Sequence, residues 1–266
     1  MLGHWWQRWR AGREAAAAQR RAIPDLLWRR TLKRFAFLPR PDTEDEATLR
    51  HMTSLFLDRK EFQGVHGLTV TDDMAVAIAA QACLPVLRLG LERYDGFVGI
   101  VVHPGQAVAR REVADDDGIV HEYDEVLSGE AVTGGPVMLS WRDVRSAGAK
   151  AAQGYNVVIH EFAHVLDMAD GLADGVPLLP PHMARAEWEA VLHREFEDFA
   201  QRVDAEEPTA LDPYAAHAPE EFFAVASEAF FVSPESLLSE HPDFYTLLVK
   251  FYRQDPARLS PHAAPS

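Results

Sequence analysis

The chain has 266 residues, of which 47% are hydrophobic and 25% are charged. This length and composition are typical of a globular protein with a substantial core, arranged as one large domain or two small ones. With 26 Lys and Arg against 41 Asp and Glu, the formal net charge is −15, which argues against a broad nucleic-acid-binding surface because such surfaces need clustered cations.

Apolar periodicity in the N-terminal half predicts three helices, at residues 11–36 with an interruption at Pro24, at residues 43–62, and at residues 71–84. Thr43 stands three residues before Glu46, a spacing typical of a helix N-cap. Thr71 occupies the equivalent position at the start of the next apolar pattern. Both threonines are therefore expected to begin helices.

The only cysteine, Cys83, lies in the apolar segment AIAAQACLPVL and is interpreted as a small buried side chain rather than a nucleophile. A single thiol cannot form an internal disulfide, so the fold does not depend on an oxidising compartment. The sequence contains neither an apolar core of signal-peptide length at its start nor an uncharged stretch of about 18 residues. We therefore expect a cytoplasmic protein without a membrane span.

The pattern changes in the middle of the chain to short runs rich in β-branched residues and bounded by turn residues. These runs predict strands at residues 96–104, 118–127 and 135–141. The sequence DDDG at residues 115–118 predicts a tight turn. After Gly148 the helical pattern returns, roughly over residues 150–169, 185–203, 219–232 and 242–253.

The expected fold class is α+β, mostly helical, with a small central mixed or antiparallel sheet. Residues 1–40 are interpreted as a basic helical N-terminal segment, residues 41–255 as a single domain, and residues 256–266 as a disordered tail.

His160-Glu161-Phe162-Ala163-His164 is an HExxH motif inside the otherwise apolar segment NVVIHEFAHVLDMADG. In a helix, the i, i+4 spacing places both imidazoles on one face. Two adjacent nitrogen donors suit a divalent transition metal, most commonly zinc, and Glu161 would act as a general base toward water. The alternative is a pair of histidines whose hydrogen bonds are satisfied within the core.

A catalytic zinc site takes three protein ligands and keeps one open position. The apolar segment EEFFAVASEAFF places Glu221 and Glu228 on one helix face. We expect Glu221 to be the third ligand, with Glu220 as the competing candidate because a one-residue shift would exchange them. Glu228 either orients a ligand histidine or forms a salt bridge, and Asp167 either supports the site similarly or lies at the surface.

Tyr214 lies seven residues before Glu221. A phenol near zinc can donate a hydrogen bond to the oxyanion of a tetrahedral intermediate. A tyrosine in a loop can also be purely structural, so the residue pattern leaves both readings open.

Four separated segments, CLPVLRLGLERYDGF, GIVHEYDEVLSGEAVTGGPVMLSW, IHEFAHVLDMADG and DPYAAHAPEEFFAVASEAFF, resemble the Mlc titration factor A family of bacterial zinc peptidases. The resemblance implies a cytosolic, gluzincin-like metallopeptidase whose catalytic region is similar in fold to the protease domain of anthrax lethal factor. It implies that His160, His164 and Glu221 bind one zinc ion, that Glu161 is the base, and that Tyr214 stabilises the transition state.

The resemblance also implicates His121 of GIVHE as a metal contact. A fourth protein ligand would fill the position that substrate or water needs, so binding by His121 would mark a resting form of the site. From the residues alone, His121 is a strand or turn histidine.

The function implied by the resemblance is hydrolysis of peptides, with an aminopeptidase preference, and binding of the glucose-responsive repressor Mlc. A strand near residues 118–124 is expected to pair with an extended peptide substrate. One alternative function is a non-catalytic interaction protein that sequesters a transcription regulator and uses zinc structurally; the other is a zinc hydrolase that acts on a non-peptide amide.

Overall fold

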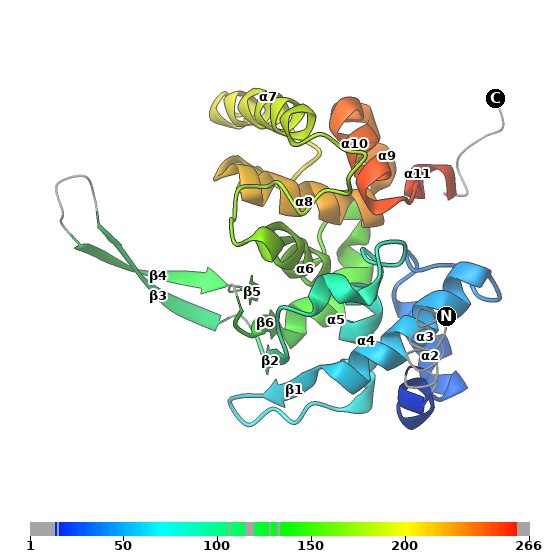
Figure 1. The fold of residues 1–266 in the computed structure, drawn as a ribbon. Coiled ribbons are helices and arrows are strands. Elements are labelled where there is room, and N and C mark those ends of the chain that lie inside the picture. The colour runs from blue at the N-terminus through cyan, green and yellow to red at the C-terminus, as the bar shows by residue number, and fades with distance from the viewer. Residues whose placement is uncertain are drawn as a thin grey trace, which may run out of the picture.

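The computed structural model describes residue 14 and residues 16–105, 107–114, 120–127, 129–131 and 134–259. For residues 107–114 and 120–127, and at Glu130 and Leu259, only the backbone is described. The fold is mostly helical, with one small sheet on the side of the helical body from which a two-stranded ribbon extends (Figure 1). No helix among the described residues is both long enough and apolar enough to cross a membrane.

The α-helices within the described ranges are α2 (Asp25–Arg34), α3 (Glu44–Arg59), α4 (Asp72–Cys83), α5 (Trp141–Lys150), α6 (Val157–Asp167), α7 (Arg185–Asp204), α8 (Pro219–Val232), α9 (Pro234–Glu240), α10 (Pro242–Tyr252) and α11 (Pro256–Leu259). Short 3-10 turns are η1 (Leu91–Tyr94), η2 (Ala151–Gln153), η3 (Met168–Asp170) and η4 (Pro213–Ala216). Residues 16–20 are also helical, so the interruption expected at Pro24 is observed.

The main sheet has the strand order β1-β2-β6-β5, with β1 (Glu61–Gly64), β2 (Gly99–His103), β6 (Val137–Ser140) and β5 (Gly129–Ala131). Strand β2 pairs in parallel with both β1 and β6, whereas β5 pairs antiparallel with β6. The expectation of a mixed sheet is therefore confirmed, and the antiparallel alternative is wrong. Parallel neighbours require long crossover connections, and helix α4 lies in the connection between β1 and β2.

Strands β3 (Ala107–Ala114) and β4 (Val120–Leu127) form an antiparallel ribbon that extends away from the body of the molecule (Figure 1). Strand β4 corresponds to the strand expected at residues 118–127. The turn expected at residues 115–118 lies outside the described residues.

The two threonine caps are confirmed. The Thr43 hydroxyl accepts from the N–H of Glu46 at 3.1 Å, and the Thr71 hydroxyl accepts from the N–H of Met74 at 3.4 Å. Helix α3 nevertheless ends at Arg59, earlier than expected, because residues 61–64, which follow its C-cap Lys60, pair with β2 as strand β1.

Three further boundaries differ from the expectation. Residues 150–169 do not form one helix, because α5 precedes α6 and Gly154, at φ 77°, ends the turn between them in the left-handed conformation that glycine tolerates best. Helix α9 begins at Pro234 where no helix was expected. Residues 256–259 form α11 rather than a disordered tail, and the N–H of Ala257 donates to the Tyr245 hydroxyl at 3.0 Å; residues 260–266 lie outside the described part of the chain.

The core is continuous from the N-terminal helices to the C-terminal ones. Trp28 of α2 and Phe35, which directly follows α2, belong to the same buried cluster as Phe162 of α6 and Trp188 of α7. Cys83 is fully buried, as expected, and burial raises the pKa of its thiol. Helices α6 and α8 pack against each other within this cluster, and α6 also packs against β5 and β6. The sheet edge and helix α8 therefore meet the same helix.

Candidate metal centre

Helix α6 carries the HExxH motif and is fixed by its buried apolar face. Val158, Ile159 and Phe162 have no exposed surface, so the helix can rotate little about its axis. Its N-cap is Asn156, whose side-chain oxygen accepts from the N–H of Ile159 at 3.1 Å. The side chains of His160 and His164 lie outside this apolar face.

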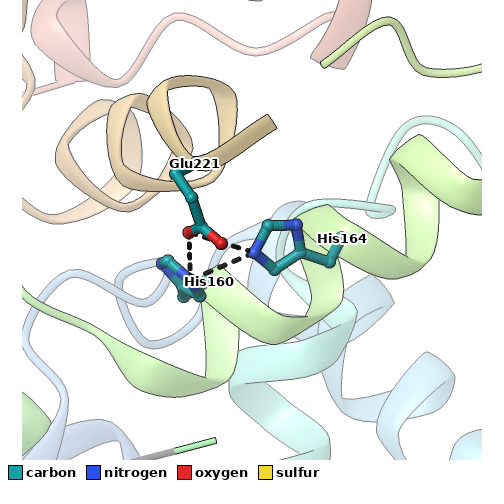
Figure 2. Close-up of side chains that lie close together, drawn as sticks. All are labelled: His160, His164 and Glu221. Atoms are coloured by element: carbon teal, nitrogen blue, oxygen red, sulfur yellow. Dashed lines mark hydrogen bonds and ion pairs between the residues drawn. The ribbon is translucent and has the colours of Figure 1, made fainter. Parts of the chain in front are cut away.

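Helix α8 begins with Pro219 at a first-turn position, where the missing N–H costs nothing. The rest of the helix is largely buried, so its carboxylates need cations or donors. Figure 2 shows the Glu221 side chain of α8 pointing toward His160 and His164 of α6.

The three side chains converge on one point. The Oε2 atom of Glu221 lies 3.2 Å from Nε2 of His160 and 3.4 Å from Nε2 of His164. The two Nε2 atoms lie 3.1 Å apart. One ligand atom from each residue falls within 4.8 Å of the others, and Glu220 is not part of this group. The structure thus brings together the residues expected to bind the metal and favours Glu221 over its neighbour.

The donor set fits a divalent cation. Glu221 Oε2 is buried, and no described donor meets it in hydrogen-bond geometry although both imidazoles lie within ion-pair distance. Two imidazole nitrogens and one carboxylate oxygen are the ligands of many catalytic zinc sites. The side chains are 14%, 13% and 19% exposed in the order His160, His164, Glu221, so solvent reaches part of each of them.

The imidazole of His160 and the carboxyl group of Glu221 each shift the pKa of the other toward its charged form. Burial lowers the pKa of His160, but its interaction with Glu221 and its hydrogen bond to Glu228 outweigh burial and hold the pKa well above its usual value. Burial raises the pKa of Glu221, but the two histidines outweigh that effect and hold the pKa below its usual range. Glu221 is thus a carboxylate at neutral pH. The carboxylates around His160 favour a positive charge at this side chain.

Glu228 lies behind His160. Its Oε1 atom accepts a hydrogen bond from Nδ1 of His160 at 2.8 Å, and its side chain is only 4% exposed. This contact agrees with the interpretation of Glu228 as a residue that orients a ligand histidine rather than one that forms a surface salt bridge.

Asp167 is fully buried at the end of α6, so the expectation that it might be a surface residue is wrong. Its Oδ2 atom accepts from the N–H of Gly175 at 3.0 Å, which fixes the loop that follows the helix. Burial raises the pKa of Asp167 to about 7, although the Gly175 N–H works in the opposite direction.

Glu161 is buried beside strand β5. A Cβ atom placed on Gly129 would overlap the Glu161 carboxyl group. The glycine leaves room for the carboxyl group in its present position, which a side chain at residue 129 would require to shift. The sheet edge and the carboxyl group expected to act as the base are therefore neighbours.

Tyr214 lies in η4, where Asp212 Oδ1 accepts from its N–H at 2.9 Å. Its ring centroid is 6.2 Å from that of His160, and the residue is 38% exposed. The ring also packs against His217, with centroids 4.8 Å apart. The structure thus places Tyr214 beside His160, one of the candidate metal ligands.

His121 lies in β4, opposite Val113. Its side chain lies outside the described part of the structure, so its expected role as a metal contact stays a prediction.

Two residues that the sequence did not single out contact this site. Asn156 donates its backbone N–H to Glu228 Oε2, and Gly129 makes room for Glu161. The first carries a sequence signal, because an Asn directly before an apolar helix is a typical N-cap. The second carries none, because the approach of β5 to α6 is visible only in three dimensions.

An HExxH helix joined by a glutamate from a neighbouring helix offers the donor set of many catalytic zinc sites, those of metallopeptidases among them. The chain belongs to the family of glucose-regulated metallo-peptidases M90, whose family model matches residues 5–253. The resemblance noted from the sequence is therefore confirmed.

Similar proteins from several bacteria are each named Mlc titration factor A. The protein of Pectobacterium atrosepticum is 41% identical over 220 residues, which cover 81% of this chain and 82% of the relative. The protein of Klebsiella pneumoniae is 36% identical over 251 residues, covering 93% and 91%. The protein of Salmonella arizonae is 36% identical over 237 residues, covering 88% and 93%.

Proposed function

We propose that the chain is a zinc-dependent peptidase that hydrolyses peptide bonds, with Glu161 as general base. The convergence of His160, His164 and Glu221 in a member of a metallopeptidase family carries the proposal. These three residues would hold the ion through two nitrogen atoms and one carboxylate oxygen. When bound, zinc would lower the pKa of water toward about 7 and polarise a carbonyl group.

The remaining roles follow from position and chemistry. Glu161, next in sequence to His160, takes a proton from the attacking water and passes it to the leaving amine. Tyr214, whose ring lies beside that of His160, donates its hydroxyl hydrogen to the oxyanion that develops on the scissile carbonyl. Protein groups thus handle the proton and share the negative charge.

The substrate would be an extended peptide that pairs with strand β5. Within the described residues, β5 is one of the two edge strands of the main sheet and pairs only with β6. An edge strand can add a peptide strand through backbone hydrogen bonds. The sequence favoured residues 118–124 for this pairing, but Gly129 of β5 is the strand residue that lies against Glu161.

The change Glu161→Gln tests the catalytic role. The amide keeps the size of the side chain but cannot accept the proton, so we expect zinc content and thermal stability near those of the unmodified chain and loss of peptide hydrolysis. The measurement is release of chromophore from aminoacyl and peptide substrates, alongside zinc analysis. Unchanged turnover by the Glu161→Gln chain would eliminate Glu161 as the base.

An aminopeptidase preference is part of the proposal and rests on the family resemblance. The matched test uses pairs of substrates that differ only in a free or an N-acetylated amino terminus. We expect the free amine to be hydrolysed faster. Equal rates for the two members of each pair would show a peptidase without this preference.

We also propose that the chain binds an Mlc-like repressor, because its relatives carry the name Mlc titration factor A. Such binding requires a cytoplasmic location, as predicted from the sequence. Co-migration of the purified chain with an Mlc protein in size-exclusion chromatography tests it. If Glu161→Gln retains binding but loses hydrolysis, the two activities are separate; if neither chain hydrolyses any substrate but both bind, the non-catalytic alternative is correct.

A further inference from the structure

The buried carboxylate of Glu228 accepts hydrogen bonds at both of its oxygens. Oε1 accepts from Nδ1 of His160 at 2.8 Å, and Oε2 accepts from the backbone N–H of Asn156. Asn156 directly precedes α6, so one carboxylate holds both the start of the metal-binding helix and one of its histidines. The position also suits an anion, because backbone N–H groups and the helix dipole favour negative charge at a helix N-terminus.

The side chain of Asn156 extends this set of contacts to a third helix. Its Oδ1 atom accepts from the N–H of Ile159, and its Nδ2 atom donates to Oε1 of Gln81 at 3.0 Å. Gln81 lies in α4 and donates through Nε2 to the carbonyl of Ala77 at 2.9 Å. Neither Asn156 nor Gln81 has exposed surface. A continuous buried chain of hydrogen bonds thus runs from α4 to His160.

The chain of contacts determines which nitrogen of His160 faces the metal-binding side chains. A carboxylate only accepts hydrogen bonds, so the hydrogen of the neutral imidazole lies on Nδ1 and the lone pair lies on Nε2. Nε2 is the atom that lies 3.2 Å from Glu221 Oε2 and 3.1 Å from Nε2 of His164. Fixing Nδ1 therefore aims the coordinating atom.

We propose that Gln81 and Asn156 are positioning residues for the metal centre, which act through Glu228 to hold Nε2 of His160 toward the ion. The inference rests on the proposed zinc-dependent function. Helix α8 then serves the site twice, with Glu221 as a ligand and Glu228 two turns later as the support of another ligand. Helix α4 contributes through the buried side-chain amide of Gln81.

The test compares three variants of the full chain with a matched control. Gln81→Met preserves length and removes the oxygen that accepts from Asn156, and Asn156→Ser keeps a capping hydroxyl but loses the donor to Gln81. Glu228→Gln alters the group that touches His160. The control is Gln254→Met, which removes another amide donor to a backbone carbonyl, that of Leu84 at 3.0 Å.

Three measurements are made on each chain: zinc affinity by competition with a chelator at fixed pH, the visible spectrum of the cobalt-substituted protein, and the midpoint of thermal unfolding. We expect Glu228→Gln to weaken zinc binding by about 10–100-fold, as loss of an outer hydrogen-bond partner typically does. Gln81→Met and Asn156→Ser should weaken it in the same direction by a smaller factor and shift the cobalt spectrum. Gln254→Met should change neither.

Each other outcome has a distinct meaning. The inference would be overturned if both Gln81→Met and Asn156→Ser kept the zinc affinity and the cobalt spectrum of the unmodified chain, whatever happens to their thermal stability. Either variant is sufficient if the other does not fold. If the unmodified chain itself binds no zinc, the proposed function fails. This result differs from failure of the positioning inference, because it is obtained without any variant.

Discussion

Gly129 of strand β5 lies against the carboxyl group of Glu161 in helix α6, so closely that a Cβ atom on the glycine would overlap the carboxyl group. The contact joins the edge of the sheet to the middle of the HExxH motif. The glycine shows no left-handed backbone conformation, so its need is for space rather than for conformational freedom. In the proposed function, the space at Gly129 would set how a substrate strand on β5 is aligned with Glu161.

The change Gly129→Ala should therefore reduce hydrolysis without removing the metal. The added methyl group must displace either the strand or the carboxyl group, and a displacement of about 1 Å at a catalytic group can cost about 100-fold in rate. We expect a loss of kcat/KM of about that size with zinc content unchanged. The control is Gly96→Ala, because a Cβ atom on Gly96 meets nothing within 4 Å. Full activity in Gly129→Ala would show that the contact is not needed for catalysis.

Removal of Glu221 should weaken zinc binding far more than removal of Glu220. Glu221 Oε2 lies between the two imidazoles, whereas Glu220 is outside the converging group. For Glu221→Ala we expect a loss beyond the roughly 10–100-fold typical of outer partners, because a direct ligand is lost. Glu220→Ala is the matched control, one residue away in the same helical turn. Chelator competition measures both, and the reverse order of affinities would mean that Glu220 is the ligand.

The positions of the candidate metal ligands could be predicted because each depends on local geometry. The i, i+4 spacing of His160 and His164 needs only a helix, and the apolar surroundings of Glu221 and Glu228 made a partner necessary. The structure distinguishes the contacts of the two carboxylates: Glu221 lies against both imidazoles, and Glu228 accepts from Nδ1 of His160.

The contacts that the sequence did not reveal join elements distant along the chain. Gln81 and Asn156 are 75 residues apart and meet only because α4 packs beside the start of α6. The parallel pairing of β1 with β2 was missed for the same reason, since strand EFQG follows α3 without a turn signal. Tertiary packing decides such pairings, and local patterns carry little information about them.

Asp167 should give the stability of the protein a distinctive pH dependence. Burial raises its pKa to about 7 from an ordinary value of 3.8, so between these values the folded chain binds a proton that the unfolded chain has lost. The free energy of unfolding should therefore fall as pH rises through this window, by a total of the order of 4 kcal/mol. At pH values well above 7 the Asp167 carboxyl group is ionised in both the folded and the unfolded chain, and this decrease ends.

The variant Asp167→Asn should remove this dependence. An amide can still accept from the Gly175 N–H, and its nitrogen would replace Oδ1, for which the described residues offer no hydrogen-bond partner. The measurement is chemical unfolding from pH 4 to 8 on chelator-treated protein, which removes the pH dependence of metal binding. The control is Asp198→Asn, at an exposed position on α7. Equal slopes for Asp167→Asn and the unmodified chain would show that Asp167 is charged throughout.

Tyr214→Phe should slow the chemical step while leaving both metal and substrate in place. The ring would still pack against His160 and His217, because those contacts are between the rings, which phenylalanine retains. Loss of one oxyanion donor typically lowers kcat by about 10²–10³-fold, and we expect that loss with KM and zinc affinity little changed. Tyr245→Phe is the control, since its hydroxyl donates to Asp255 at 2.8 Å instead. A normal kcat for Tyr214→Phe, or a rise in KM alone, would restrict Tyr214 to binding or packing and leave the oxyanion to other groups.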